Sequence, residues 1–133
     1  MFMKILAAID GTDTSTKVLM EATRMAVSTH GTLRIVYVAT EDTDQKASLK
    51  LLAQAKSAVG DGVTVDTRVL HTEAVYGVTG IVDALANGVR EWGADLVVVG
   101  SSHRRGLVRW VIGSVAEQLI AKVDASVLLV RPH

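Results

Sequence analysis

The amino-acid sequence predicts an α/β fold, with an open five-stranded parallel sheet and four helices covering both of its faces. Two kinds of apolar pattern alternate along the chain: short runs of β-branched and aliphatic residues, and longer stripes at helical spacing. The length of 133 residues matches one ordinary domain, and no low-complexity linker or internal repeat interrupts the alternation. We therefore expect a single domain over residues 1–133.

The predicted strands are of two types. Runs at residues 5–9, 33–38, 96–99 and 127–130 are mostly aliphatic, which is typical of parallel strands buried on both faces. The run at residues 63–69 alternates valine with charged and hydroxyl side chains. We expect this more polar run at the edge of the sheet, where one flank meets water.

The predicted helices lie between these runs. The clearest extends from Val78 to Trp92, with apolar residues three and four positions apart, and Gly93 is expected to end it. Similar stripes run over residues 49–59, before a Gly-Asp-Gly breaker, and over residues 116–123.

A fourth stripe covers residues 18–26. Here Asp13, Thr14 or Ser15 is the expected N-cap, and the helix is expected to end near Gly31.

Composition excludes several classes of function. Fourteen basic residues balance fourteen acidic ones, so no long-range field attracts nucleic acid or an anionic membrane surface. The chain has no cysteine, which rules out disulfides, thiolate metal sites and cysteine nucleophiles. No apolar run approaches the roughly 20 residues that span a bilayer, and the N-terminus lacks the pattern of a secretory signal. We expect a cytoplasmic protein without membrane insertion.

Polar and glycine residues follow three of the predicted strands, where open parallel sheets bind their ligands. Asp10, Gly11 and Thr12 follow the first strand, Ala39 and Thr40 the second. A glycine-rich loop, with Arg104 and Arg105 near its start, runs from Gly100 to Ser114 after the fourth and leads into a helix. Backbone amides at a helix N-terminus suit an anion, and Asp10 can accept a hydrogen bond from a ribose hydroxyl or hold a metal ion. A nucleotide is the predicted ligand.

Three segments give the chain a family resemblance: residues 4–12, residues 93–101, and residues 113–117 with the closing 127–132. Together they resemble small universal stress proteins of the adenine-nucleotide-binding superfamily. The resemblance implies the sheet order 3-2-1-4-5, adenine near Val38 at the end of the second strand, ribose near Asp10, and phosphates along the glycine loop. It also implies a stress-response function and a homodimer through the last strand, from Val127 to Val130. That strand is apolar and no helix follows it, which independently invites pairing with a second copy.

The ATP-binding branch of that family carries glycine, two residues, glycine, nine residues, then glycine and a small hydroxyl residue. In this chain Gly100, Gly113 and Ser114 match the pattern, and His103 stands at the second glycine. If the loop needs only a positive φ at this position, histidine can adopt it; if the loop needs space, the imidazole occupies the phosphate site. Alternatively, His103 adds hydrogen-bond donors together with Arg104 and Arg105, or all three are solvated loop residues. The expected nucleotide-binding residues are Asp10, Gly11, Thr12, Val38, Gly100, Ser101, His103, Arg104, Arg105, Gly106, Gly113, Ser114 and Val115.

Signals for catalysis are absent from the sequence. It contains no G-x-S-x-G nucleophile elbow, no Walker loop with its lysine, and no paired carboxylates at a telling spacing. His30, His71 and His133 are far apart and show no metal-ligand spacing.

Three hypotheses follow. The first is a binding module that holds an adenine nucleotide, ATP first among them and with Mg²⁺ as an optional companion, and whose occupancy biases its conformation. The second is a nucleotide-free dimerising interaction protein, and the third a slow ATPase or autophosphorylating protein.

Overall fold

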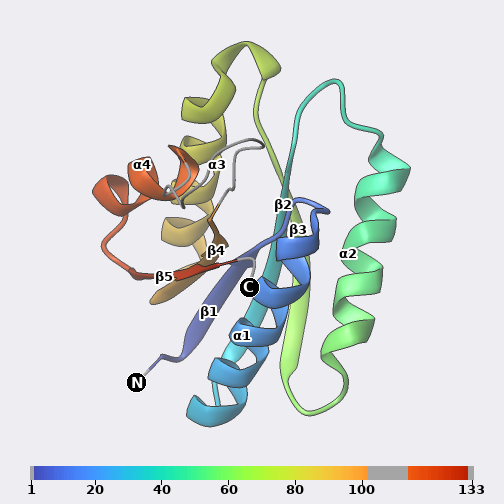
Figure 1. The fold of residues 1–133 in the computed structure, drawn as a ribbon, viewed down its shortest axis with the longest axis vertical. Helices are drawn as coiled ribbons and strands as arrows, with labels where there is room; N and C mark the ends of the chain where they lie inside the picture. Colours follow the sequence, from blue (N-terminus) through green and yellow to red (C-terminus); the bar gives the residue numbers. More distant parts are fainter. Residues whose placement is uncertain (1, 102–113, 132–133) are drawn as a thin grey trace.

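The computed structural model of the protein describes residues 2–101 and 114–131. In chain order the strands are β1 (Lys4–Ala8), β2 (Thr32–Ala39), β3 (Thr64–His71), β4 (Leu96–Gly100) and β5 (Ser126–Val130). The helices are α1 (Asp13–Thr29), α2 (Gln45–Val59), the short 3-10 helix η1 (Ala74–Tyr76), α3 (Gly77–Trp92) and α4 (Ser114–Lys122). Strands and helices alternate as the apolar patterns predict (Figure 1).

The five strands form one sheet in the order β3-β2-β1-β4-β5, and every pairing is parallel. This confirms the fold class and the sheet order that the resemblance implies. The polar run at residues 63–69 forms β3 from Thr64 onward, and β3 lies at one edge of the sheet, as the charged residues of the run indicate.

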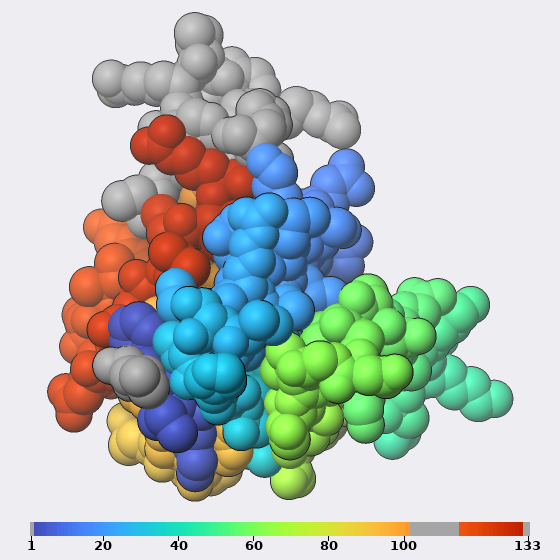
Figure 2. All heavy atoms as spheres, turned by 90° about the horizontal axis from the view of Figure 1, so that it is seen from below, coloured from blue at the N-terminus to red at the C-terminus, as the bar shows by residue number. Residues whose placement is uncertain are grey.

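The sheet separates two apolar layers, one with α1 and α2 and the other with α3 and α4. The ribbon in Figure 1 shows how these helices are arranged around the sheet. Side chains of β1 alternate between them: Ile5 and Ala7 pack with α1 and α2, whereas Leu6 packs with α3 and α4. All three are fully buried. In the space-filling view, α1 lies between α2 and the C-terminal segment on one face of the molecule (Figure 2).

The helix ends differ in detail from their predicted positions. The N-cap of α1 is Thr12, one residue before the three candidates, because the chain turns at Gly11 with φ +83° and the helix begins at Asp13. The helix ends at Thr29, and His30 takes the left-handed conformation just before Gly31. Helix α3 ends at Trp92 with Gly93 left-handed, as expected.

Polar contacts fix the amino-terminal end of the sheet. The Asp95 carboxylate accepts hydrogen bonds from the backbone N–H of Met3 at 2.9 Å and of Lys4 at 3.1 Å, joining the starts of β1 and β4. On β2, the Arg34 guanidinium makes a two-pronged bond to Asp66 of β3, both N···O distances being 2.9 Å. No residue spacing in the sequence predicted these long-range pairs.

Candidate functional site

The carboxyl ends of β1, β2 and β4 are neighbours, because β1 lies between the other two and all three run in parallel. Pairing continues just beyond β1, where the N–H of Ile9 donates to the carbonyl of Val36 on β2 at 3.0 Å. The sheet therefore brings the residues after Ala8, Ala39 and Gly100 to one edge, which is the edge where open α/β sheets bind ligands.

The Asp10 carboxylate is held in one orientation by the turn that leads into α1. Its Oδ1 accepts from the N–H of Thr12 at 3.0 Å, from Thr12 Oγ1 at 2.6 Å and from Ser15 Oγ at 2.9 Å. Ser15 Oγ also accepts from the N–H of Asp10 at 3.0 Å. Within the described residues, no hydrogen bond uses Oδ2 of Asp10.

These hydrogen bonds set the charge state of Asp10. Partial burial would raise the pKa of this carboxyl, but the hydrogen bonds from the Thr12 hydroxyl and amide and from Ser15 outweigh it and lower the pKa below the ordinary 3.8. Asp10 is therefore a fixed anion at neutral pH, able to accept a hydrogen bond from a ligand.

Gly100, the first glycine of the loop pattern, lies at the end of β4 against the start of α1. A Cβ at this position would stand 2.7 Å from Thr14 Cγ2 and 3.4 Å from Val18 Cγ2. Its φ is not among the positive values of the described chain. The structure therefore assigns the glycine to close packing of helix on strand, a reason that the sequence analysis did not consider for this position.

Ser101 follows Gly100 and is buried, at 5% exposure. Both its N–H, at 2.8 Å, and its hydroxyl, at 3.3 Å, donate to the carbonyl of Val130 on β5. These donors already serve the sheet, which gives Ser101 a structural role at the position where the sequence analysis expects a ligand contact.

Two other predicted residues lie in the apolar layer on the α3 side of the sheet. Val38 and Val115 are partly buried and pack against that layer. Val38 pairs with Leu70 of β3 near the carboxyl ends of both strands, and both side chains belong to this aliphatic layer. Ser114 begins α4, where the sequence analysis places the N-terminus of the last helix.

The remaining predicted residues, His103, Arg104, Arg105, Gly106 and Gly113, lie outside the described residues. Their part in the site stays a prediction.

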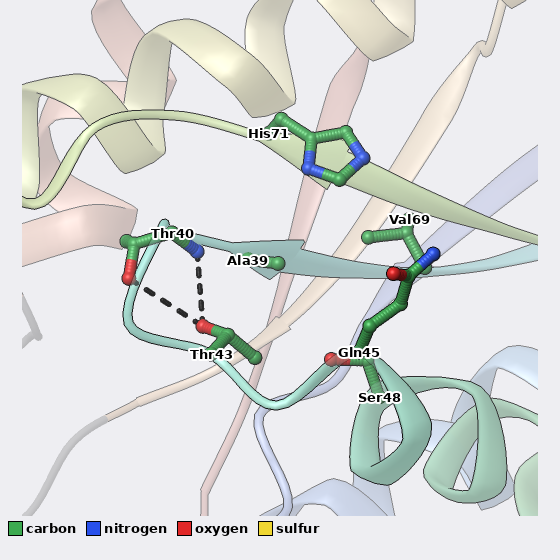
Figure 3. A pocket seen from close by; sticks show the side chains of 7 residues that line it. All are labelled: Ala39, Thr40, Thr43, Gln45, Ser48, Val69 and His71. Carbon is green, nitrogen blue, oxygen red and sulfur yellow. Dashed lines mark hydrogen bonds between the residues drawn. The ribbon is translucent and has the colours of Figure 1, made fainter.

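A surface hollow of about 200 Å³ lies near the predicted site, between the ends of β2 and β3 and the start of α2. Figure 3 shows Thr40 and Thr43 on one side of it, Gln45 and Ser48 on α2, and His71 on β3. Thr43 Oγ1 accepts from the N–H of Thr40 at 2.9 Å, which closes the loop after β2.

Ala39 and Val69 complete the lining of the hollow. Val69 packs with the α1 and α2 layer, so the hollow opens on the face of the sheet opposite Val38. Of its lining residues the sequence analysis named Ala39, Thr40 and His71, and it found no metal-ligand spacing around His71.

Ser15 and Thr14 contact residues of the candidate site, whereas the sequence analysis considered them only as helix caps. Ser15 instead orients Asp10, and Thr14 packs on Gly100. The hydroxyl-rich run from Thr12 to Thr16 was a visible signal, but five adjacent hydroxyl and acidic residues offered no way to choose among them.

Clusters of three or more histidine, aspartate and glutamate side chains that could hold a metal ion do not occur in residues 2–101 and 114–131. Across the same residues, no helix combines the length and apolarity that a bilayer crossing requires. At Asp10, Oδ1 already accepts three hydrogen bonds, so only Oδ2 could meet a Mg²⁺ ion carried by a nucleotide.

The strand order defines the class as a doubly wound α/β protein, whose candidate ligand site is the topological switch point where the polar residues follow the strands. Comparison with known proteins gives the family. Residues 1–131 match the sequence model of the universal stress protein family. The chain belongs to this family, a family of stress-response proteins.

Individual relatives agree with this assignment. The universal stress protein YxiE of Bacillus subtilis is 31% identical, and the match covers 98% of this chain and all of the relative. A solved structure of a universal stress protein family member from Burkholderia pseudomallei is 26% identical, with a TM-score of 0.74 and coverage of 96% of this chain and 94% of that one.

Two solved structures with the same fold contain nucleotides. A universal stress protein in complex with cAMP is 22% identical, with a TM-score of 0.72 and coverage of 99% of both chains. The universal stress protein of Archaeoglobus fulgidus in complex with dAMP is 21% identical, with a TM-score of 0.72 and coverage of 96% of this chain and 97% of that one.

Proposed function

We propose that the protein binds an adenine nucleotide, with ATP as the first candidate, at the carboxyl ends of β1, β2 and β4. The observation that carries the proposal is the Asp10 carboxylate, ionised and locked by Thr12 and Ser15 beside the ends of the neighbouring strands. A fixed anion of this kind recognises a sugar hydroxyl without a reorganisation cost. The relatives solved with cAMP and dAMP support the same ligand class.

The proposed site divides the nucleotide among three strand ends. Asp10 receives the ribose, the aliphatic surface of Val38 receives the adenine, and the loop from Gly100 to Ser114 with the N-terminus of α4 receives the phosphates. Mg²⁺ accompanies the phosphates in this proposal. The nucleotide acts as a regulatory ligand, since its occupancy shifts the population of conformations that a partner protein meets.

Mass spectrometry of the denatured protein tests the proposal. The purified protein is precipitated and the supernatant analysed, first as isolated and again after incubation with ATP and Mg²⁺. Retained adenine nucleotide supports the proposal; no retained nucleotide in either sample contradicts it and leaves the nucleotide-free interaction protein. Phosphate release from bound ATP, measured in the same samples, tests the slow ATPase hypothesis.

The variant His103→Gly restores the family pattern and separates the interpretations of this residue. Higher affinity for ATP in the variant means that the imidazole obstructs the phosphates, and lower affinity means that it donates to them. Equal affinity means that the side chain is a solvated part of the loop.

We also propose a homodimer through β5. Among residues 2–101 and 114–131 this strand is the last of the sheet, and no described strand pairs with its outer edge along Val127 to Val130. Unpaired backbone groups on a largely apolar edge favour pairing with a second copy, because the two-fold arrangement satisfies both edges at once. Light scattering over a range of concentrations tests this, and a monomer at the highest concentration contradicts it.

A further inference from the structure

The Asp10 carboxylate has two oxygens with different surroundings. Three donors from two residues converge on Oδ1, at 2.6 to 3.0 Å. A carboxylate oxygen offers about two lone-pair directions, so Oδ1 has no capacity left for a ligand. Asp10 as a whole is exposed, and its other oxygen accepts nothing from the described residues.

This asymmetry limits how Asp10 can hold a sugar. In a bidentate contact with the cis-diol of ribose, each carboxylate oxygen accepts a hydrogen bond from one of the two hydroxyls. That two-pronged contact is unavailable here, since Oδ1 is already saturated by Thr12 and Ser15. Two further hydrogen bonds hold the same turn. The N–H of Asp10 donates to Ser15 Oγ, and the N–H of Ser15 donates to the carbonyl of Thr12, both at 3.0 Å.

We infer that Asp10 accepts a hydrogen bond from one ribose hydroxyl only, through Oδ2, so that the site requires a hydroxyl at one sugar position and tolerates its loss at the other. This inference rests on the proposed function, because it concerns the sugar of the proposed nucleotide. Thr12 and Ser15 are positioning residues in this arrangement: they touch Asp10 and set which oxygen the ligand meets.

Isothermal titration with ATP, 2′-deoxy-ATP and 3′-deoxy-ATP tests the inference. One of the two deoxy nucleotides is expected to bind about 10- to 100-fold more weakly than ATP, the range for a lost hydrogen bond to a charged group. The other is expected to bind within about 2-fold of ATP, since its missing hydroxyl has no carboxylate oxygen to meet.

The variant Asp10→Asn provides a second readout. Three donors still point at the Oδ1 position, so the amide oxygen must take that place and the amide NH₂ must replace Oδ2. The turn is kept, but the ligand meets a neutral donor in place of an anionic acceptor. The preference for ATP over the sensitive deoxy nucleotide is expected to fall below about 10-fold, the range of a neutral hydrogen bond.

A matched control is Asp13→Asn, which removes an exposed carboxylate three residues away in the first turn of α1. This variant should bind ATP, 2′-deoxy-ATP and 3′-deoxy-ATP with the same relative affinities as the unmodified protein.

The outcomes separate the two proposals. If ATP binds and both deoxy nucleotides are weakened by more than about 10-fold, Asp10 grips both hydroxyls and the inference is overturned while the proposed function stands. If ATP binds and neither analogue is weakened, or Asp10→Asn keeps the full preference, Asp10 does not hold the sugar and the inference is again overturned. If no nucleotide binds, both the proposed function and the inference fail.

Discussion

The packing of Gly100 against α1 leads to a stability prediction that can be worked out from distances. In Gly100→Ala, the new Cβ would stand 2.7 Å from Thr14 Cγ2. Non-bonded carbon atoms in van der Waals contact lie about 3.5 to 4.0 Å apart, so the start of α1 or the end of β4 must move by about 0.8 Å. Forced shifts of this kind in packed regions cost about 1 to 3 kcal/mol.

A second substitution, at Thr14, removes the methyl group that the new Cβ would meet. In Thr14→Ala, Cγ2 is gone and the nearest Thr14 atom to the new Cβ is the Cβ at 3.5 Å, an ordinary distance. Gly100 has no positive φ, so alanine there also reduces the freedom of the unfolded chain, which is worth about 0.4 to 1 kcal/mol. In the Thr14→Ala background, Gly100→Ala should therefore leave the free energy of unfolding unchanged or raise it slightly.

Urea unfolding of the four proteins in this double-mutant cycle measures the free energy of unfolding in each background. Gly62→Ala is the control, because a Cβ at Gly62 meets nothing within 4 Å and the change should not destabilise. An equal cost of Gly100→Ala in both backgrounds would refute the packing explanation. A cost of similar size at Gly62 would mean that loss of glycine itself, and not the contact with Thr14, is what the protein resists.

Three further predictions concern polar contacts. Arg34→Lys loses the bidentate hydrogen bond to Asp66 and the stacking of the guanidinium on Trp92 at 4.6 Å, so it should lower the free energy of unfolding by about 1 kcal/mol. The control Arg24→Lys, at an exposed position, should change the free energy of unfolding little. Asp95→Ala leaves two amides at the start of β1 without their acceptor and should cost about 1 to 2 kcal/mol in chemical denaturation; an unchanged midpoint would mean that water replaces the carboxylate fully. Because folding lowers the pKa of Asp10, its ionised form stabilises the protein above the unfolded pKa. If the unmodified protein has a higher free energy of unfolding than Asp10→Asn, this difference should shrink as the pH falls through the folded pKa. A difference that grows in acid contradicts the lowered pKa of Asp10.

The fold could be predicted almost entirely from sequence, because the two apolar periods differ so clearly. Residues 96–99 are continuous aliphatics and form a strand buried on both faces, whereas the stripe from Val78 to Trp92 forms α3. The order of the strands came from the resemblance, since periodicity reports which residues are buried but not which strands are neighbours.

The candidate site could be predicted only in outline. Asp10 was identified because it follows a strand, yet the choice of its oxygen depends on how Thr12 and Ser15 turn toward it. The reason for glycine at position 100 depends on a helix that begins elsewhere in the chain. Such details follow from three-dimensional packing, which adjacent residue types in a sequence do not specify.

The central position of β1 has a consequence for how the protein is made. Lys4 pairs with Thr32, 28 positions later, but on the other side Ile5 pairs with Leu96, 91 positions later. At about 5 to 20 residues per second, a ribosome needs several seconds to deliver β4 after β2 has emerged. During that time the middle of the future sheet is an open edge, able to pair with any extended chain nearby. The order of synthesis thus leaves the central strand of the finished sheet open to incorrect pairing while the chain is still being made.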